Sequence, residues 1–215
     1  MKRTKLEFVK KVQESGDIYS FYFKPLSKFR HEAGQHGLLS LPGGKGNRPF
    51  SLASSPAEQY VIVGPHVRES SSYKQALAEL KPGDIVSMRG PILNFTFDSS
   101  KSTSVMLAQG IGITPFRSML LHKKEVDLPM KIVLVHVAAD KHAYRDITEK
   151  IADESLYLTT KEEFAQQTTE TAKKLGNDAV YFVSGSPAFI ASTKKLLIES
   201  GIAGKNIRKD SFFGY

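Results

Sequence analysis

Val105-Met106-Leu107-Ala108-Gln109-Gly110-Ile111-Gly112-Ile113-Thr114-Pro115 sets the fold class, because it joins a buried strand to a helix through a glycine turn. Gly110 and Gly112 permit a tight turn and the close approach of a pyrophosphate. Thr114 can cap the following helix with Pro115 at its first position, so that the helix amides face an anion. The stretch predicts a dinucleotide site, although Pro115 replaces the third glycine of the usual fingerprint. A plain strand-to-helix connection is the alternative.

The second half of the chain alternates between apolar strands and helices from Ser104 onward. The predicted strands are Val105–Ala108, Lys131–Val137 and Val180–Val183, and the predicted helices are Phe116–Lys124, Ala143–Asp153, Lys161–Leu175 and Pro187–Ser200. The strands are apolar enough to be buried on both faces, which is typical of a parallel sheet with crossover helices. We therefore predict an α/β parallel-sheet nucleotide-binding domain over residues 103–215.

The first half shows short strands separated by closely spaced turns, a pattern that predicts an antiparallel sandwich or barrel. The predicted strands are Lys5–Val12, Ile18–Phe23, Gly37–Leu41, Phe50–Ala53, Tyr60–Val67 and Ile85–Arg89. One helix, Tyr73–Leu80, is capped by Ser72 and stopped by Lys81-Pro82-Gly83-Asp84. Because the segment 98–102 is polar like a linker, the chain is predicted to have two domains. An antiparallel β-barrel over residues 1–98 precedes the α/β domain.

Composition excludes several classes of function. The 215 residues contain no cysteine, so disulfides, thiolate catalysis and cysteine-ligated iron–sulfur or zinc sites are excluded. The six histidines are dispersed, with no i, i+4 pair near a carboxylate, and we expect no metal site. A net charge of +8 suits an acidic protein partner or phosphate-bearing ligands. The basic residues form no arginine-rich run, so we expect no nucleic-acid partner.

The distribution of apolar residues indicates where in the cell the protein is located. No apolar run approaches the roughly 18 to 20 residues that span a bilayer. The basic Met1-Lys2-Arg3-Thr4-Lys5 precedes an alternating stretch and not the apolar core of a signal peptide. We therefore expect no membrane association and a cytoplasmic protein.

Arg48-Pro49-Phe50-Ser51 is a second candidate site, at the start of a strand after a glycine-rich loop. An arginine can fork onto a phosphate, an aromatic side chain can pack against a planar ring, and a serine hydroxyl can bond a ring heteroatom. Taken alone, these residues fit an ordinary strand start equally well. Further segments accompany them in order: Gly34-Gln35, Arg68 with Ser70-Ser71-Ser72, and Gly90-Pro91 with Asn94-Phe95.

In this order, over nearly the whole chain, the motifs resemble the ferredoxin–NADP reductase superfamily of flavin-dependent oxidoreductases. That family binds FAD through an Arg-x-Tyr-Ser motif. The resemblance implies Arg48 on the pyrophosphate, Phe50 beside the isoalloxazine and Ser51 near its N5. It also implies that Ser71 or Ser72, at the start of the barrel helix, helps to hold the pyrophosphate.

The resemblance extends through the nucleotide half. The family's Gly-Gly-x-Gly-x-Thr-Pro turn matches Gly110, Gly112, Thr114 and Pro115, with Gln109 in place of the first glycine. Ser184-Gly185-Ser186-Pro187 resembles the family's Cys-Gly-Pro segment beneath the nicotinamide, and Asp210-Ser211-Phe212-Phe213-Gly214-Tyr215 resembles its acidic-aromatic C-terminus. Three departures stand out. Phe50 lacks the tyrosine hydroxyl, Leu93 stands where relatives often carry glycine, and Ser184 replaces the cysteine.

The implied reaction is hydride transfer from nicotinamide C4 to flavin N5, with the protein supplying position and electrostatics. The expected catalytic residues are Ser51, Ser184 and Tyr215, and a C-terminal aromatic, Phe212 or Tyr215, is expected to cover the flavin face. The residues expected to bind FAD and NADH or NADPH are Arg48, Pro49, Phe50, Ser51, Arg68, Ser71, Ser72, Tyr73, Gly110, Gly112, Thr114, Pro115, Gly185 and Phe212.

Several points stay open at this stage. Asp140 suits the ribose hydroxyls of NADH, whereas the nearby Lys141, His142 and Arg145 suit the 2′-phosphate of NADPH. Arg117 is either a phosphate contact or an exposed helical arginine, and His36 is expected to face solvent or to fill a strand face.

Three functions fit the sequence. The first is an NAD(P)H-dependent flavoprotein reductase that passes electrons to a separate acceptor, such as an acidic ferredoxin or flavodoxin. The second is a reductase of free flavin, quinones or ferric chelates, and the third is a non-catalytic nucleotide-binding subunit.

Overall fold

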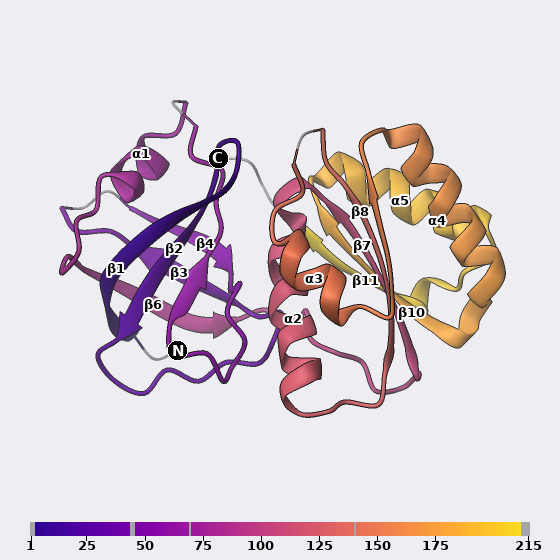
Figure 1. The fold of residues 1–215 in the computed structure, drawn as a ribbon, viewed down its shortest axis with the longest axis horizontal. Coiled ribbons are helices and arrows are strands. Elements are labelled where there is room, and N and C mark those ends of the chain that lie inside the picture. Colours follow the sequence, from indigo (N-terminus) through magenta and orange to yellow (C-terminus); the bar gives the residue numbers. More distant parts are fainter. Residues whose placement is uncertain (1–2, 44–45, 69, 140, 212–215) are drawn as a thin grey trace.

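The computed structural model describes residues 3–43, 46–68, 70–139 and 141–211, which form two β-sheets that lie side by side (Figure 1). The first sheet is antiparallel, with strand order β4-β3-β6-β1-β2-β5. Its strands are β1 (Arg3–Ser15), β2 (Ile18–Pro25), β3 (His36–Ser40), β4 (Asn47–Ser51), β5 (Val61–Val63) and β6 (Ile85–Ile92), accompanied by helix α1 (Ser72–Ala78). Within the described ranges, the edge strands β4 and β5 are joined through an isolated bridge between Leu52 and Val63. The sheet is therefore barrel-like without being closed.

The second sheet is parallel, with strand order β11-β10-β7-β8-β9. Its strands are β7 (Thr103–Gln109), β8 (Lys131–Val137), β9 (Glu154–Leu158), β10 (Ala179–Gly185) and β11 (Ile207–Ser211). The α-helices are α2 (Thr114–Glu125), α3 (Arg145–Ile151), α4 (Lys161–Leu175) and α5 (Pro187–Glu199), and the 3-10 helices are η1 (Gly110–Ile113), η2 (Gly176–Asp178) and η3 (Gly204–Asn206). The predicted fold class, a barrel-like antiparallel sheet followed by an α/β parallel sheet, is confirmed.

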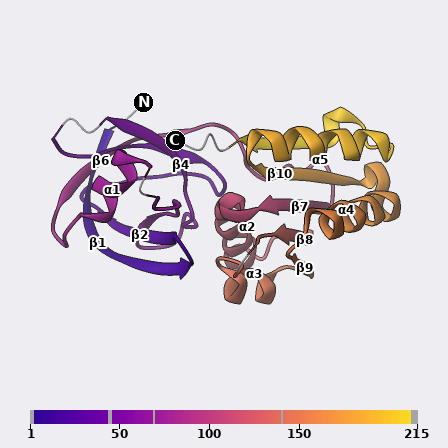
Figure 2. The same ribbon diagram turned by 90° about the horizontal axis from the view of Figure 1, so that it is seen from above.

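The helices cover the two faces of the parallel sheet in pairs (Figure 2). Side chains of α2 and α3 pack with Met106, Leu134 and Phe182 on the face toward the first sheet. Side chains of α4 and α5 pack with Val105 and Tyr181 on the other face. Strands covered on both faces become continuous apolar runs, which is why β7, β8 and β10 were recognisable in the sequence.

Two strands of the parallel sheet, β9 and β11, have no counterpart among the predicted strands. They are the edge strands of the sheet, and their sequences are Glu154-Ser155-Leu156-Tyr157-Leu158 and Ile207-Arg208-Lys209-Asp210-Ser211. An edge strand pairs on one side only and exposes part of its side chains, so it needs no apolar run. The predicted helix over Ala143–Asp153 is shorter in the structure because Tyr144, with a φ of 59°, precedes its first turn.

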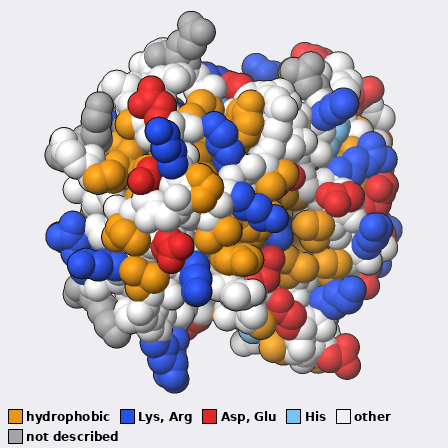
Figure 3. Space-filling model, turned by 60° about the vertical axis from the view of Figure 1, so that its left-hand side comes forward, with side chains coloured by type: hydrophobic (Ala, Val, Ile, Leu, Met, Phe, Trp, Pro, Cys, Tyr) orange, Lys and Arg blue, Asp and Glu red, His pale blue; other side chains and the backbone are white. Residues whose placement is uncertain are grey.

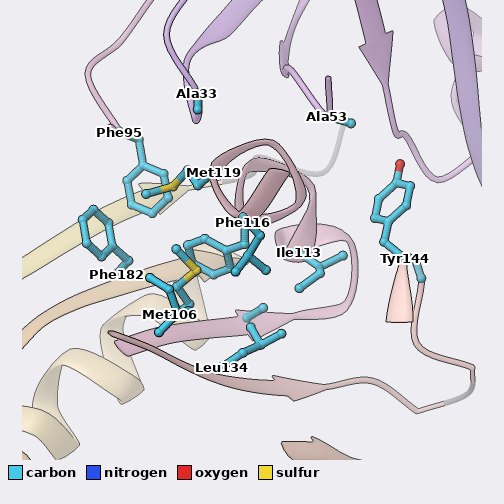
Figure 4. Close-up of a cluster of buried hydrophobic side chains, with 14 of the residues drawn as sticks. Ala33, Ala53, Phe95, Met106, Ile113, Phe116, Met119, Leu134, Tyr144 and Phe182 are labelled. Carbon is cyan, nitrogen blue, oxygen red and sulfur yellow. The ribbon is translucent and has the colours of Figure 1, made fainter. Parts of the chain in front are cut away.

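The two sheets share one hydrophobic core (Figure 4). Phe95, from the first half, packs edge-to-face on Phe182 of β10, with ring centroids 5.4 Å apart, and its centroid lies 5.8 Å from that of Phe116 on α2. Ala33 and Ala53 of the first half belong to the same buried cluster. Because this core is continuous, the sheets hold one another in place. The division into domains 1–98 and 103–215 stays a prediction.

Arg117 of α2 links the two sheets across the same interface through an ion pair and a hydrogen bond. Its guanidinium donates to both carboxylate oxygens of Glu58, at 2.8 and 2.9 Å, and to the carbonyl of Ala53 at 2.6 Å. The side chain is 6% exposed. Both predictions for Arg117, a phosphate contact and an exposed helical arginine, are therefore wrong. The position of Arg117 in the sequence of α2 does not reveal that the first sheet covers this face of the helix.

Replacing Arg117 with Met is expected to destabilise the chain by about 2 kcal/mol, because the buried carbonyl of Ala53 would lose its donor and the partly buried Glu58 would lose its partner. Urea denaturation followed by circular dichroism measures this change. Arg145→Met is the matched control, since Arg145 pairs with Glu149 on the exposed face of α3 and its loss should cost about 0.5 kcal/mol or less. Equal losses in the two variants would contradict the prediction.

Candidate functional site

A cavity of about 790 Å³ opens between the two sheets, at the carboxyl ends of β7, β8 and β10. Ligands of open parallel sheets bind at this edge. One wall belongs to the first sheet and includes Asp17, residues 48–51 and His66. The opposite wall belongs to the second sheet and includes residues 109–112 and 185–187. The cavity therefore brings together the two motifs that the sequence analysis singled out.

The glycine turn forms the 3-10 helix η1, which is part of the second wall of the cavity. Gly110 has a φ of 52°, which favours glycine. A Cβ on Gly112 would lie 2.2 Å from the carbonyl oxygen of Ser184, so only glycine lets the turn pack against the end of β10. The predicted cap is wrong in detail. Thr114 is the first residue of α2, and its hydroxyl donates to the carbonyl of Ile111 at 2.8 Å, because η1 runs directly into the helix.

Ser184, Gly185 and Ser186 close the cavity beside the glycine turn. Gly185 and Ser186 line it, and the hydroxyl of Ser186 donates to the side-chain oxygen of Gln109 at 2.8 Å. Ser184 is fully buried behind them, and among the described residues its hydroxyl has no hydrogen-bond partner. Its expected contact with nicotinamide stays a prediction.

On the opposite wall, Arg48, Pro49, Phe50 and Ser51 all line the cavity, as part of β4. Tyr73 supports them from behind. Its ring centroid lies 5.5 Å from the Arg48 guanidinium carbon and 6.1 Å from the Phe50 ring. Burial raises the pKa of Tyr73, so its hydroxyl stays protonated and donates to a backbone carbonyl at 2.7 Å. Phe50 thus has an aromatic backing on its inner side.

Ser51 belongs to a buried polar group that crosses between the sheets. His36 Nε2 lies 2.8 Å from the Ser51 hydroxyl and 3.0 Å from the carboxylate of Asp210 on β11. The Ser51 hydroxyl also donates to Asp210 at 3.3 Å. The expectation that His36 faces solvent is wrong, because it is 4% exposed on β3 directly opposite Ser51. Phe212 and Tyr215 lie outside the described residues.

The start of α1 lies beside this wall, and its cap is Ser71. The Ser71 hydroxyl accepts from the backbone N–H of Lys74, so the predicted cap, Ser72, is displaced by one residue. Lys74 lines the cavity, and burial together with the nearby Arg68 lowers its pKa. Among the described residues, Ser71, Ser72 and Tyr73 do not line the cavity. Leu93 has a φ of 63°, a left-handed conformation that favours glycine.

Asp17 and His66 form a pair at the cavity mouth that sequence reasoning missed. His66 Nδ1 lies 2.6 Å from one Asp17 oxygen, and the Arg68 Nε donates to the other at 3.0 Å. Burial lowers the pKa of His66. Burial raises the pKa of Asp17, but the bonds from His66 and Arg68 bring it below its usual value. The two residues meet only because a tight turn and the end of β5 are adjacent in space.

The charge of the cavity wall is strongly positive. Its cations are Arg48, Arg68, Lys74, Lys141 and Lys161, whereas the carboxylate among the described lining residues is that of Asp17, already paired. Arginine and lysine in a concave site attract phosphate esters. The described part of the chain contains no group of three His, Asp or Glu side chains that could hold a metal. The wall is suited to ligands that carry several phosphates.

His136 of β8 lies beneath the glycine turn, and its Nε2 is 2.9 Å from the carbonyl oxygen of Gly110. Burial and the neighbouring His142 lower the pKa of His136 to about 3, so the ring is neutral. No sequence motif marked His136 as a site residue. A histidine inside an apolar strand was the available signal.

Comparison with known proteins finds several relatives. No family model matches the sequence. A flavohemoprotein of Bacillus subtilis is 30% identical over 233 residues, covering 94% of this chain and 57% of the relative. A tetrachlorobenzoquinone reductase of Sphingobium chlorophenolicum is 30% identical over 192 residues, covering 83% of this chain and 58% of the relative. The chain thus spans less than two thirds of the length of these relatives.

Solved structures agree on the fold. A ferredoxin NADP+ reductase from Neisseria gonorrhoeae with bound FAD and NADP superposes with a TM-score of 0.85 at 19% identity, over 99% of this chain and 100% of that one. The ferredoxin reductase in carbazole 1,9a-dioxygenase superposes with a TM-score of 0.85 at 17% identity, over 99% of this chain and 70% of that one. The arrangement of both sheets is therefore shared with these reductases.

Gly112→Ala is expected to destabilise the chain by about 2 kcal/mol and to weaken dinucleotide binding, because the added Cβ meets the Ser184 backbone. Thermal unfolding and calorimetric titration with NADP+ measure both effects. Gly204→Ala serves as control, since the nearest atom to its added Cβ is 4.0 Å away. Wild-type stability in Gly112→Ala would show that the turn is not packed as described.

The buried His136 predicts a pH dependence of stability. As the pH falls below 6.5, the unfolded chain takes up a proton on this ring while the folded chain does not until about pH 3. Its contribution is therefore fully present above pH 6.5, and about 2 kcal/mol is lost by pH 5. In urea denaturation at pH 7 and pH 5, His136→Gln should lose less stability than the wild type. Equal losses would contradict a neutral buried His136.

Proposed function

We propose that the chain is a flavoprotein reductase of the ferredoxin–NADP reductase superfamily, which oxidises NAD(P)H and passes the electrons to a separate acceptor. The observation that supports this function best is that one cavity between the sheets is lined by both motifs. One wall presents Arg48–Ser51, and the other presents the Gly110–Gly112 turn. Two ligands that must react with each other are brought together by such an arrangement.

FAD fits the first wall. Arg48 offers a forked donor for the pyrophosphate, with Lys74 and Arg68 as further cations on the same wall. Phe50, backed by Tyr73, offers a ring face, and the Ser51 hydroxyl is held by His36 and Asp210 at the end of β4. When bound, FAD supplies hydride acceptance from a nicotinamide and electron release to the acceptor. We assign this role to residues 1–98.

The dinucleotide fits the second wall, and we assign it to residues 103–215. The leading amides of η1 suit a pyrophosphate, and Gly185 and Ser186 line the cavity beside the turn. Lys141 and Lys161, which also line the cavity, are compatible with the extra phosphate of NADPH. Asp140, the residue that would favour NADH, lies outside the described residues. Both nucleotides are therefore candidates.

The catalytic roles of Ser51, Ser184 and Tyr215 remain proposals. Ser51 has the best support, because it lines the cavity while its hydroxyl is held by two buried partners. Ser184 would act through the backbone that it shares with Gly185. In this scheme the side chains orient the reactants and exclude water, and none of them needs to act as acid or base.

The acceptor is proposed by class. A net charge of +8 favours an acidic electron carrier, such as a ferredoxin or flavodoxin. On the face shown in Figure 3, Lys and Arg side chains are dispersed among hydrophobic and acidic ones, so attraction would come from the overall charge. The quinone reductase among the relatives favours a second candidate, a small organic acceptor. Among the helices of the described residues, none has the length and apolar character of a membrane span.

The purified protein is expected to bind FAD and to lose its flavin absorbance when mixed anaerobically with NADH or NADPH in a stopped-flow instrument. Arg48→Met should weaken FAD binding by roughly 10- to 100-fold, because a charge-assisted contact with the pyrophosphate is lost. Arg89→Met is the matched control, an exposed arginine of the same sheet that does not line the cavity.

Two outcomes would contradict the proposal. Absence of bleaching with both nucleotides would leave a non-catalytic nucleotide-binding subunit, and equal FAD binding in both variants would remove Arg48 from the site. Reoxidation of the reduced protein by an acidic ferredoxin, compared with a quinone, separates the two acceptor classes.

A further inference from the structure

We propose that His136 is a positioning residue for dinucleotide binding, which orients the Gly110–Ile111 peptide so that its N–H faces the ligand. The inference rests on the proposed function, because it concerns the same nucleotide site. It adds a residue that does not touch the ligand and lies one layer beneath the turn.

The hydrogen bond fixes both partners. His136 lies on β8 directly opposite Ala108 of β7, two residues before the turn begins. The side chain is fully buried, and its Nε2 lies 2.9 Å from the carbonyl oxygen of Gly110. A carbonyl only accepts, so the hydrogen of the neutral ring is on Nε2 and points at Gly110. The direction of the Gly110 carbonyl is thus set from the interior of the protein.

That direction determines where the next N–H points. The carbonyl of Gly110 and the N–H of Ile111 belong to one planar trans peptide group, in which they point in opposite directions. With the carbonyl held toward His136, the Ile111 N–H points away from the interior. Gly110, Ile111 and Gly112 all line the cavity. Because Gly110 has a φ of 52° and no side chain, this peptide is restrained mainly by the i→i+3 bonds of η1, and the bond from His136 adds a second restraint.

Two aromatic rings keep His136 in this orientation. The His142 ring packs edge-on against it with centroids 4.9 Å apart, and Tyr157 of β9 packs against both histidines, at 6.1 and 5.3 Å. His142 is in turn bonded to the carbonyl of Leu158 at 3.0 Å, and the Tyr157 hydroxyl lies 2.8 Å from that of Thr148. The His136 ring therefore has little freedom to turn away from Gly110.

The ring cluster of His136, His142 and Tyr157 also joins separate parts of the cavity wall. Residues 138, 139 and 141, which line the cavity, lie between His136 and His142 in the chain, and residues 159 and 161 follow Tyr157 closely. The glycine turn is anchored to the same cluster through His136. A change at His136 is thus expected to alter nucleotide binding while the flavin wall, on the first sheet, is unaffected.

The test uses the full-length flavoprotein and calorimetric titration with NADP+, NAD+ and ADP. In His136→Phe, which keeps a ring but removes the donor, the Kd of each nucleotide should rise about tenfold, the effect of about 1.4 kcal/mol. His136→Gln, whose side-chain amide can still donate to Gly110, should stay within about threefold of the wild type. His136→Asn, which is too short to reach, should behave like His136→Phe and replaces it if the Phe variant does not fold.

His31→Phe is the matched control. His31 makes the same kind of bond, from Nε2 to the carbonyl of Ser54 at 3.0 Å, but Ser54, unlike Gly110, does not line the cavity. Its nucleotide Kd should equal that of the wild type. In steady-state kinetics, His136→Phe should raise the KM for NAD(P)H while kcat at saturation and the FAD content stay at wild-type values. If His136 had a merely structural role, kcat and the FAD content would fall together with the affinity for the nucleotide.

The outcomes separate the two proposals. If the wild type binds no nucleotide, the proposed function fails, and the role of His136 fails with it. If the wild type binds but His136→Phe binds equally well, or His136→Gln is as weak as His136→Phe, only the role of His136 is overturned.

Discussion

Helix α2 between the two sheets is the constraint on which the rest of the structure depends. Its first turn continues the glycine turn of the nucleotide wall, and its body supplies Phe116 and Met119 to the core shared by both sheets. Arg117, itself buried, adds an ion pair with the partly exposed Glu58 on the opposite side of the interface. One helix therefore holds the turn in place and sets the width of the cavity. Movement of α2 would disturb packing and site together.

The cavity combines a rigid frame with an excess of positive charge. On one wall, Tyr73 backs Arg48 and Phe50, and on the other, His136 anchors Gly110. These supporting side chains are buried and hydrogen-bonded to backbone carbonyls. These supporting contacts hold the residues that face the ligand in place, so that binding costs little conformational entropy. Phosphate-bearing cofactors match the charge of the cavity.

Sequence patterns located most elements because burial on both faces, or alternation on one, is recorded in the residues themselves. Strand β8 and helix α4 have the bounds that the pattern predicts. Strands β9 and β11 were not predicted, because edge strands need no apolar run. The cap of α1 was displaced by one residue because Ser71 and Ser72 offer the same hydroxyl, and only backbone geometry separates them. Local chemistry is thus readable to within a residue or two.

By itself, the sequence determined the order of the two sheets, the glycine turn and the Arg48–Ser51 segment, because each depends on neighbours in the chain. Tertiary structure alone decided which distant side chains meet. It buried His36 against Asp210, turned Arg117 toward Glu58, paired Asp17 with His66 and put His136 under Gly110. These contacts join residues that strand order and helix packing bring together, and no periodicity along the chain records them.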